Sequence, residues 1–308
     1  MDAVLGTVLA TRGRDLLATT VGGCIAFWCL GVIAIADLPR LVAVPARCAD
    51  PDAKTWCIVA DSAGLVLAAL LVLGALGVIT SAAVVVALTE PVLVLVSGDG
   101  WPRGGWAGRF TTWCRSGQAR QRHRLVERAN AGESRAAVAL AWYPTGERLL
   151  RPTRAGNAFA SLAQRVGRRH GLELSTCWGL FEEVLDESTR GRVETASSAL
   201  TRRINNLLWA VAALLWVPAL PTWMAFGLGG AVLLLVVLLW VGMTTAAQRY
   251  CRVVEAAIMM HRRSLYEAVG WPLPASTSTE PDEGRTLTAY IDRMGLVDEV
   301  VLQWPVSS

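Results

Sequence analysis

The sequence has almost no lysine, few histidines and little charge for its length. Lys54 is the only lysine, there are three histidines, and charged residues make up 18% of the 308 positions. A typical soluble domain is about one quarter charged. The basic charge is therefore carried by arginine, whose planar guanidinium suits phosphate and carboxylate recognition. We favour a GC-rich genome as the source of this bias, because Ala, Val and Gly are enriched as well.

Motifs for common metal and catalytic chemistry are also missing. The seven cysteines form no CxxC pair, and the three histidines lie far in sequence from any pair of cysteines. Neither a zinc site nor a dense disulfide scaffold fits that pattern. The chain has no nucleophile elbow, Walker loop, Rossmann fingerprint or HExxH motif. We expect no cofactor and no metal, and a non-enzymatic role is favoured.

Charge is absent from three long apolar runs, which cover residues 16–36, 62–89 and 204–248. One membrane crossing needs about 20 apolar residues, so the third run suits two crossings. Pro218 and Pro221 in its middle favour a turn between them. The sequence thus predicts an all-α integral membrane protein with four transmembrane helices. A cleaved signal peptide ending at Ala36 is the alternative for the first run, but its apolar core is longer than usual for one.

The distribution of arginine predicts the orientation. Residues 99–204 hold 18 arginines against 10 acidic residues, whereas residues 37–61 hold 3 basic and 4 acidic residues. Basic segments stay on the cytoplasmic side, which places both termini inside a plasma membrane protein that crosses the bilayer several times. The loop with Cys48 and Cys57 then lies outside, where a disulfide is possible and two free thiols are the alternative. Ionisable residues are absent from the runs, which argues against an ion-coupled transporter.

A basic and aromatic segment follows the second run. Trp101, Trp106 and Trp113 alternate there with Arg103 and Arg109. Residues 98–129 are expected to form an amphipathic helix at the lipid headgroups, where Trp and Arg are both favoured. Its apolar side would carry Phe110, Trp113 and Cys114, and its other side Arg115, Arg120, Arg122, Arg124 and Arg128. Nucleic-acid binding is the alternative for such a segment, and its place after a membrane helix favours lipid.

Periodicity predicts further helices in the polar parts. Thr153 is a candidate N-cap for a helix over residues 158–166, which would end near Gly171. Apolar stripes extend the last two spans from about Ser188 to Val269 as an antiparallel pair of stalks. Pro91 should stop or kink the second span. Residues 275–284 are expected to be flexible, with one more short helix over 286–295.

The same patterns divide the chain into four parts. These are a membrane helix pair over residues 1–97, an Arg-rich helical insert over 98–203, the membrane hairpin over 204–248, and a stalk helix with a flexible tail over 249–308.

The best candidate for a binding site lies in the Arg-rich insert. Arg154 and Asn157, together with Thr153 and Gly156, could bind an anion or a partner, or clamp a neighbouring loop. Tyr143-Pro144, the run from Arg151 to Asn157 and the Trp-Pro-Leu-Pro element at 271–274 resemble an uncharacterised family of actinobacterial polytopic membrane proteins with a P-T-R-x-G-N motif. Ala155 stands where that family usually has leucine. The resemblance implies a membrane architecture and no known activity.

These observations favour a non-enzymatic membrane protein whose cytoplasmic unit binds a partner or anionic lipid and relays to the membrane, as a scaffold or a membrane-perturbing effector. The expected partners are the bilayer and a cytoplasmic protein or a second copy of the chain, and no nucleic acid. One alternative is a membrane enzyme for a phosphorylated or lipid substrate that uses Arg154, Asn157 and the Glu182-Glu183 pair. A weaker alternative is a channel or transporter subunit.

Overall fold

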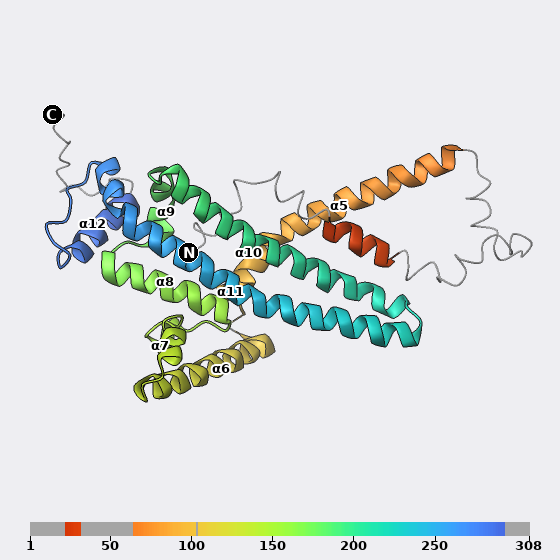
Figure 1. The fold of residues 1–308 in the computed structure, drawn as a ribbon, viewed down its shortest axis with the longest axis horizontal. Helices are drawn as coiled ribbons and strands as arrows, with labels where there is room; N and C mark the ends of the chain where they lie inside the picture. Colours follow the sequence, from red (N-terminus) through yellow and green to blue (C-terminus); the bar gives the residue numbers. More distant parts are fainter. Residues whose placement is uncertain (1–21, 32–63, 103, 293–308) are drawn as a thin grey trace, which may run out of the picture. The chain divides into compact units, whose positions relative to one another are not determined.

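The computed structural model describes residues 22–31, 64–102 and 104–292, and these residues form helices and turns without any strand. Figure 1 shows the helices, coloured along the sequence from red near the N-terminus to blue near the C-terminus. The predicted all-α class is confirmed for this part of the chain. Cys48, Cys57 and Arg103 lie outside the described residues. A short apolar helix, Gly22–Gly31, comes before the labelled elements, which are α5 (Gly64–Ser97), α6 (Gly105–Asn130), α7 (Ser134–Leu140), η3 (Glu147–Leu149), α8 (Arg154–His170), α9 (Leu174–Glu183), α10 (Glu187–Ala213), η4 (Leu214–Ala219), α11 (Thr222–Val269) and α12 (Glu280–Asp292).

Two of these helices, Leu71–Ser97 within α5 and Thr222–Val269, are long and apolar enough to cross a membrane. The most apolar window of each has a mean hydropathy of 2.5. The core helix of a soluble protein can be equally apolar, but its apolar side chains are covered by the rest of the fold. Only 11% and 6% of the most apolar windows of the two helices are buried. Their apolar surface is therefore left uncovered by the described chain, as expected for helices that contact lipid.

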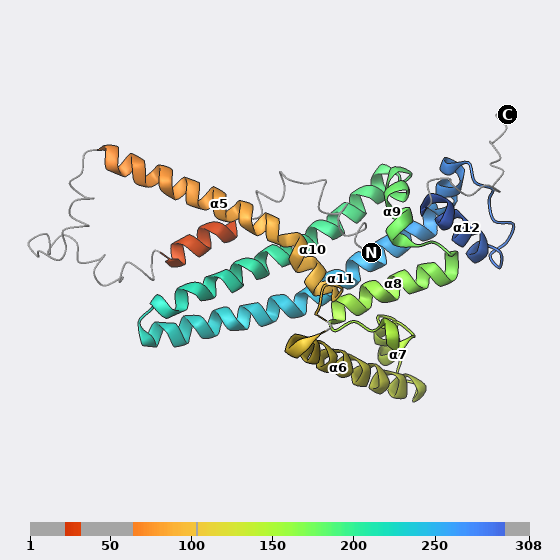
Figure 2. The same cartoon turned by 180° about the vertical axis from the view of Figure 1, so that it is seen from behind.

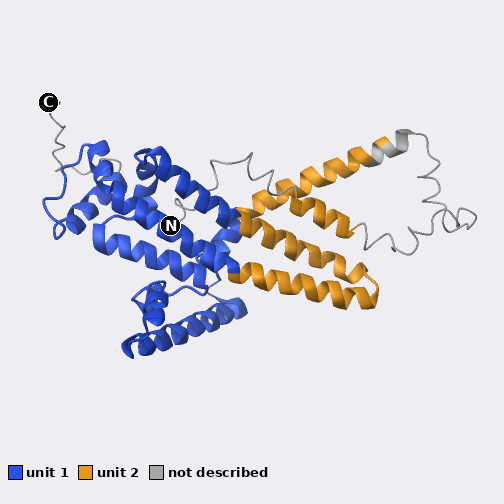
Figure 3. Ribbon diagram, in the orientation of Figure 1, with its two compact units in different colours: residues 1–11, 90–201, 242–308 blue, residues 12–89, 202–241 orange. Residues whose placement is uncertain are grey.

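The chain divides into two compact units, which Figure 3 colours separately. Among the described residues, the apolar unit holds residues 22–31, 64–89 and 202–241. The polar unit holds residues 90–102, 104–201 and 242–292. Three helices, α5, α10 and α11, contribute residues to both units.

The apolar unit has a small core of Cys24, Val85 and Trp209. The Cys24 thiol lies 3.1 Å from the Ser81 hydroxyl, which joins the short helix to α5. A side chain at Gly23 would overlap the Trp209 indole, so this glycine allows the short helix to approach α10 closely. The segments from the first, second and third predicted crossings thus pack together within this unit.

The predicted hairpin turn is confirmed near the two prolines. The helix α10 ends at Ala213, the 3₁₀ helix η4 contains Pro218, and α11 begins at Thr222, directly after Pro221. The helices α10 and α11 run side by side in both views (Figures 1 and 2). In the polar unit, His261 of α11 lies 3.0 Å from Asp186, just before the start of α10, so the two helices are antiparallel.

Most residues of the predicted stripes of the two stalks are buried, whereas Leu208, Val253 and His261 are half-buried. The buried residues include Val193, Ala196, Leu200 and Ile204 on α10, and Val254, Ala257, Ile258 and Leu265 on α11. Residues three or four apart share one face of a helix, which is why the pattern could be read from the sequence.

Pro91 does not end its helix, so the expectation of a stop there is wrong. The helix α5 continues through Pro91 to Ser97. Proline removes one backbone hydrogen bond, which an apolar helix tolerates when the freed carbonyl is satisfied locally. The helix therefore carries Glu90 and the apolar run after it into the polar unit.

The prediction that residues 275–284 are flexible is also wrong for residues 280–284. They form the first turn of α12, which packs on α8 and α9. Leu287 is fully buried, and Glu280 is buried beside His170. Acidic residues in a first turn interact favourably with the helix dipole, so an acidic composition that resembles a disordered tail here begins a helix.

Candidate functional site

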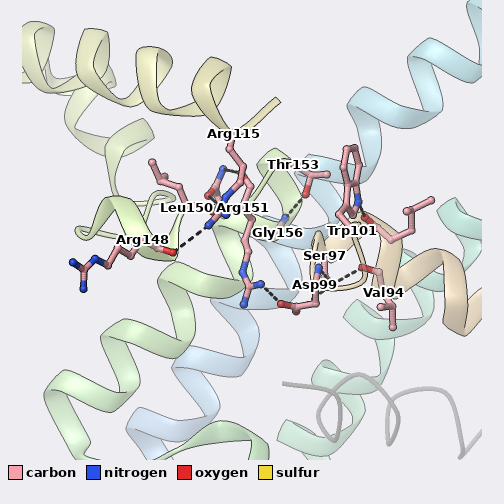
Figure 4. A network of polar contacts seen from close by, with 12 residues as sticks. Val94, Ser97, Asp99, Trp101, Arg115, Arg148, Leu150, Arg151, Thr153 and Gly156 are labelled. Atoms are coloured by element: carbon pink, nitrogen blue, oxygen red, sulfur yellow. Dashed lines mark hydrogen bonds and ion pairs between the residues drawn. The ribbon is translucent and has the colours of Figure 1, made fainter. Parts of the chain in front are cut away.

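The candidate motif lies where the end of α5 meets the start of α8, within the polar unit. Thr153 is the N-cap of α8, since its hydroxyl accepts a hydrogen bond from the Gly156 amide at 2.9 Å. The same hydroxyl donates to the Val96 carbonyl near the end of α5 at 2.5 Å. One side chain therefore satisfies an unpaired amide of one helix and a terminal carbonyl of another. Figure 4 shows the surrounding polar network.

Two glycines make this close approach possible. A Cβ at Gly156 would overlap the backbone carbonyl of Ser97. Gly98 has φ +77°, a conformation that side chains disfavour, and a Cβ there would lie 2.6 Å from Pro152. The glycine of the P-T-R-x-G-N motif is thus a packing residue at a helix junction.

The loop before α8 is fixed by side chains from two directions. Arg151 forms an ion pair with Asp99, which follows α5 (Figure 4). Arg115 of α6 donates from Nε to the Leu150 carbonyl at 2.9 Å and from Nη2 to the Arg148 carbonyl at 3.2 Å. The loop carbonyls are therefore occupied by a guanidinium from α6.

Asn157 clamps the same loop. It is fully buried; its Oδ1 accepts from the Arg151 amide at 2.8 Å, and its Nδ2 donates to the Arg151 carbonyl at 3.2 Å and to Gln118 Oε1 at 3.3 Å. No group of Asn157 is left to face a ligand. Arg154 is exposed and donates to Gln121 Oε1 at 3.0 Å. The four motif residues are thus brought together, and three of them hold the junction.

The exposed face of α6 carries large aromatic side chains that are open to solvent. Trp106, Phe110 and Trp113 are 85%, 51% and 65% exposed. Phe110 stacks on Trp101 with ring centroids 5.7 Å apart and lies 5.9 Å from Trp113. The Trp101 indole donates to the Leu95 carbonyl at 2.6 Å, which ties this aromatic cluster to the end of α5.

The expectation that all arginines of α6 lie opposite its aromatic side is wrong. Arg115 and Arg122 do, and Arg122 donates to the Thr145 carbonyl at 2.9 Å. Arg120 and Arg124 are exposed at helical spacing from Trp113, on the same face as the aromatic rings. We call this surface the α6 face; it consists of Trp106, Arg109, Phe110, Trp113, Arg120 and Arg124.

In the acidic cluster considered for catalysis, the Asp186 carboxylate accepts a hydrogen bond from Ser188 just before α10, whereas the contact at Glu182 is made by its backbone carbonyl. Burial raises the pKa of Glu182, and Arg190 donates to the Glu182 carbonyl at 2.9 Å. The hydroxyls of Ser188 and Thr189, with a smaller contribution from His261, lower the pKa of Asp186 to about 2. Among the described residues, no group of three or more His, Cys, Asp or Glu side chains is placed to hold a metal ion.

Several contacts of this site were not predicted from the sequence. The Arg151–Asp99 pair, the contact of Gly98 with Pro152 and the hydrogen bonds of Arg115 join parts of the chain that are distant in sequence. The isolated Gly98-Asp99-Gly100 run after an apolar helix was the available signal, since glycines there indicate a tight turn.

No protein-family model, curated protein or solved structure matches this chain. The resemblance to membrane proteins with a P-T-R-x-G-N motif therefore stays a prediction, and the function has to be inferred from the geometry.

Proposed function

We propose that the chain is a non-enzymatic, four-span plasma membrane protein whose polar unit lies in the cytoplasm and binds the anionic inner leaflet through the α6 face. In this proposal the protein is a membrane scaffold or effector, and the remaining helical surface of the polar unit is available to a cytosolic partner. The observation that carries the proposal is the α6 face itself, where three exposed aromatic rings and three exposed arginines share one side of a helix.

The composition of this face fits a bilayer interface. Tryptophan is favoured at the headgroup level because its ring is apolar and its N–H is polar. Each arginine near an anionic leaflet adds about 1 kcal/mol of attraction. Soluble monomers seldom expose contiguous apolar patches of this kind without a binding role. The face begins at Trp106, only nine positions after the apolar helix that ends at Ser97.

Packing in the apolar unit supports four crossings. Segments from each of the four predicted spans belong to this unit. Thr89 of α5 donates to Asn205 of α10 at 2.7 Å, a buried polar contact that could join two helices in lipid. Trp223 and Phe226, at the start of α11, are 75% and 80% exposed and would form an aromatic belt at the outer interface.

The helix α11 supports the proposed relay, because it is one continuous helix of 48 residues that contributes residues to both units. The catalytic alternative is not retained, because Asn157 is buried and its amide group is engaged in holding the loop before α8.

The test is reconstitution of the full chain in nanodiscs with brominated acyl chains, with and without anionic lipid. Brominated lipid quenches only tryptophans at the bilayer. We expect the Trp106→Phe/Trp113→Phe variant to lose a quenchable component of the fluorescence that the wild-type chain shows in anionic nanodiscs. Hydrogen exchange of α6 should also be slower in anionic than in zwitterionic nanodiscs, because the bound face is held against the lipid.

Charge is tested with a matched pair of variants. Arg120→Gln/Arg124→Gln removes two arginines of the α6 face, whereas Arg168→Gln/Arg169→Gln removes two exposed arginines at the end of α8. Only the first variant should lose the dependence of α6 protection on anionic lipid. If both variants behave as the wild-type chain, or if tryptophan quenching is the same without Trp106 and Trp113, the α6 face does not bind the bilayer.

A further inference from the structure

A cavity of about 580 Å³ lies at the far end of α11, between its last turns and the start of α12. Its size is within the range of small-molecule sites. Its lining contains two arginines, three hydroxyl side chains and the carboxylate of Glu280, together with apolar side chains. The lining residues used below are Met260, Arg262, Arg263, Tyr266, Leu273 and Thr277.

Two side chains of the lining have hydrogen-bond donors without a partner among the described residues. Arg263 donates from Nε to Glu267 at 3.0 Å, and in the described part of the chain its terminal nitrogens have no partner. The Thr277 side chain is exposed, and its hydroxyl likewise makes no hydrogen bond to a described residue. Guanidinium groups and hydroxyls of this kind bind phosphate oxygens, and the fork of arginine does so with two parallel hydrogen bonds.

Tyr266 is the most buried of these lining residues. Its side chain is 1% exposed, and its hydroxyl has almost no accessible surface and no hydrogen-bond partner among the described residues. The hydroxyl is therefore not a contact for a ligand in the cavity.

The single carboxylate in the wall does not oppose an anion strongly. Glu280 is held by Arg262 Nε at 2.9 Å and by His170 Nδ1 at 2.7 Å, and its side chain is 9% exposed. Its charge is therefore compensated from within the protein. Its contact with Arg262 also fixes that guanidinium at the cavity wall, which reduces the entropy lost when a ligand binds.

We propose that this cavity binds an organic phosphate, with the phosphate group on Arg263, Arg262 and Thr277 and an apolar body against Met260 and Leu273. Both of these apolar side chains are exposed, Met260 by 56% and Leu273 by 40%, so a ligand that covers them removes apolar surface from water. The site is separate from the α6 face, and the inference does not depend on the proposed function.

The probe is phenyl phosphate, titrated by calorimetry into the purified full chain in detergent micelles, with inorganic phosphate and phenol as fragments. We expect saturable binding of phenyl phosphate at or below roughly 5 mM, since so small a ligand makes few contacts. It should bind more tightly than either fragment, because each fragment keeps only one of the two proposed contacts.

Arg263→Gln should weaken phenyl phosphate binding about tenfold or abolish it, since it removes charge-assisted hydrogen bonds. Arg285→Gln is the matched control, because Arg285 is exposed, pairs with an acidic residue within its own helix as Arg263 does, and does not line this cavity. Absence of saturation by phenyl phosphate, or equal effects of the Arg263 and Arg285 variants, overturns the proposal.

Discussion

Gly156 packs against the backbone carbonyl of Ser97 so closely that a Cβ at position 156 would overlap the carbonyl oxygen. This contact joins the first turn of α8 to the last residue of α5. Thr153 reinforces it through its hydrogen bonds to Val96 and Gly156. The junction brings the apolar helix and the polar helices of one unit together through backbone atoms, which cannot move aside as a flexible side chain can.

The first prediction concerns this junction. Gly156→Ala should destabilise the chain by about 1–3 kcal/mol, as overpacking against a rigid neighbour does. The measurement is the thermal unfolding midpoint of the purified chain in detergent.

Gly117→Ala is the control for this substitution. Gly117 lies inside α6 with open space around its Cβ position. Because alanine favours a helix by about 1 kcal/mol over glycine, this variant should unfold at an equal or higher temperature. Equal behaviour of the two alanine variants would show that the Ser97 contact relaxes at no cost.

The second prediction concerns the attachment of α12. Glu280 is buried between His170 and Arg262. Gly171 and Gly284 lie beside it at a crossing of two backbones where a Cβ on either glycine would overlap a backbone oxygen. Glu280→Gln removes the charge and leaves the two basic partners without it, which should cost about 1–3 kcal/mol. We expect faster hydrogen exchange over residues 280–292, measured by mass spectrometry.

Asp282→Asn is the matched control, because Asp282 lies in the same first turn of α12 but is exposed and pairs only with Arg285 within the helix. Exposed pairs of this kind contribute little to stability. Exchange in α12 should therefore be nearly unchanged. If Asp282→Asn accelerates exchange as much as Glu280→Gln, the helix dipole and not the buried pair holds α12 in place.

Features that depend on local periodicity could be predicted from the sequence. The stalk stripes, the Thr153 N-cap, the end of α8 near Gly171 and the turn at Pro218 and Pro221 each follow from spacing or from a residue type with one conformational preference. These signals act over a few residues, so one sequence contains them in full.

Features that depend on contacts between distant parts of the chain could not be predicted from the sequence. The acidic segment at the start of α12 has the composition of a flexible tail, and the contacts of Glu280 with His170 and Arg262 join parts of the chain that are far apart in sequence. The hydrogen bonds of Arg115 and Arg122 depend on carbonyls of a loop that lies 23 to 35 residues further on. Composition cannot separate these arginines from Arg120 and Arg124, which lie on the α6 face instead.

The third prediction concerns the stability of the chain at acidic pH. Hydrogen bonds from Ser188 and Thr189 lower the pKa of Asp186 from 3.8 to about 2. The unfolded chain therefore binds this proton at a higher pH than the folded chain does. The stability that Asp186 contributes is complete above pH 3.8 and is lost as the pH falls toward 2.

Ser188→Ala removes the strongest of these hydrogen bonds, at 2.6 Å. It should lower the thermal unfolding midpoint near neutral pH, and the difference from the wild-type chain should shrink as the carboxylate becomes protonated. Circular dichroism from about pH 6 to about pH 2 follows both chains. A difference that persists unchanged at the acid end would mean that the serine acts through packing and not through the Asp186 charge.

The fourth prediction uses cysteines to test the orientation. Burial raises the pKa of the Cys177 thiol, so little of the reactive thiolate is present and the sulfur is covered. Cys114 on α6 is only half-buried, although burial raises the pKa of its thiol as well. Cys114 and not Cys177 is therefore the suitable reporter for the polar unit.

We expect a membrane-impermeant maleimide to leave Cys114 unmodified in intact cells and to modify it after permeabilisation, as identified by peptide mass spectrometry. Cys177 should react only after the chain is denatured, which separates burial from sidedness. Cys48 and Cys57, after reduction, should react in intact cells because the proposed topology places them outside. Modification of Cys114 in intact cells would place the polar unit on the outer side, and binding to the anionic inner leaflet would then be excluded by geometry.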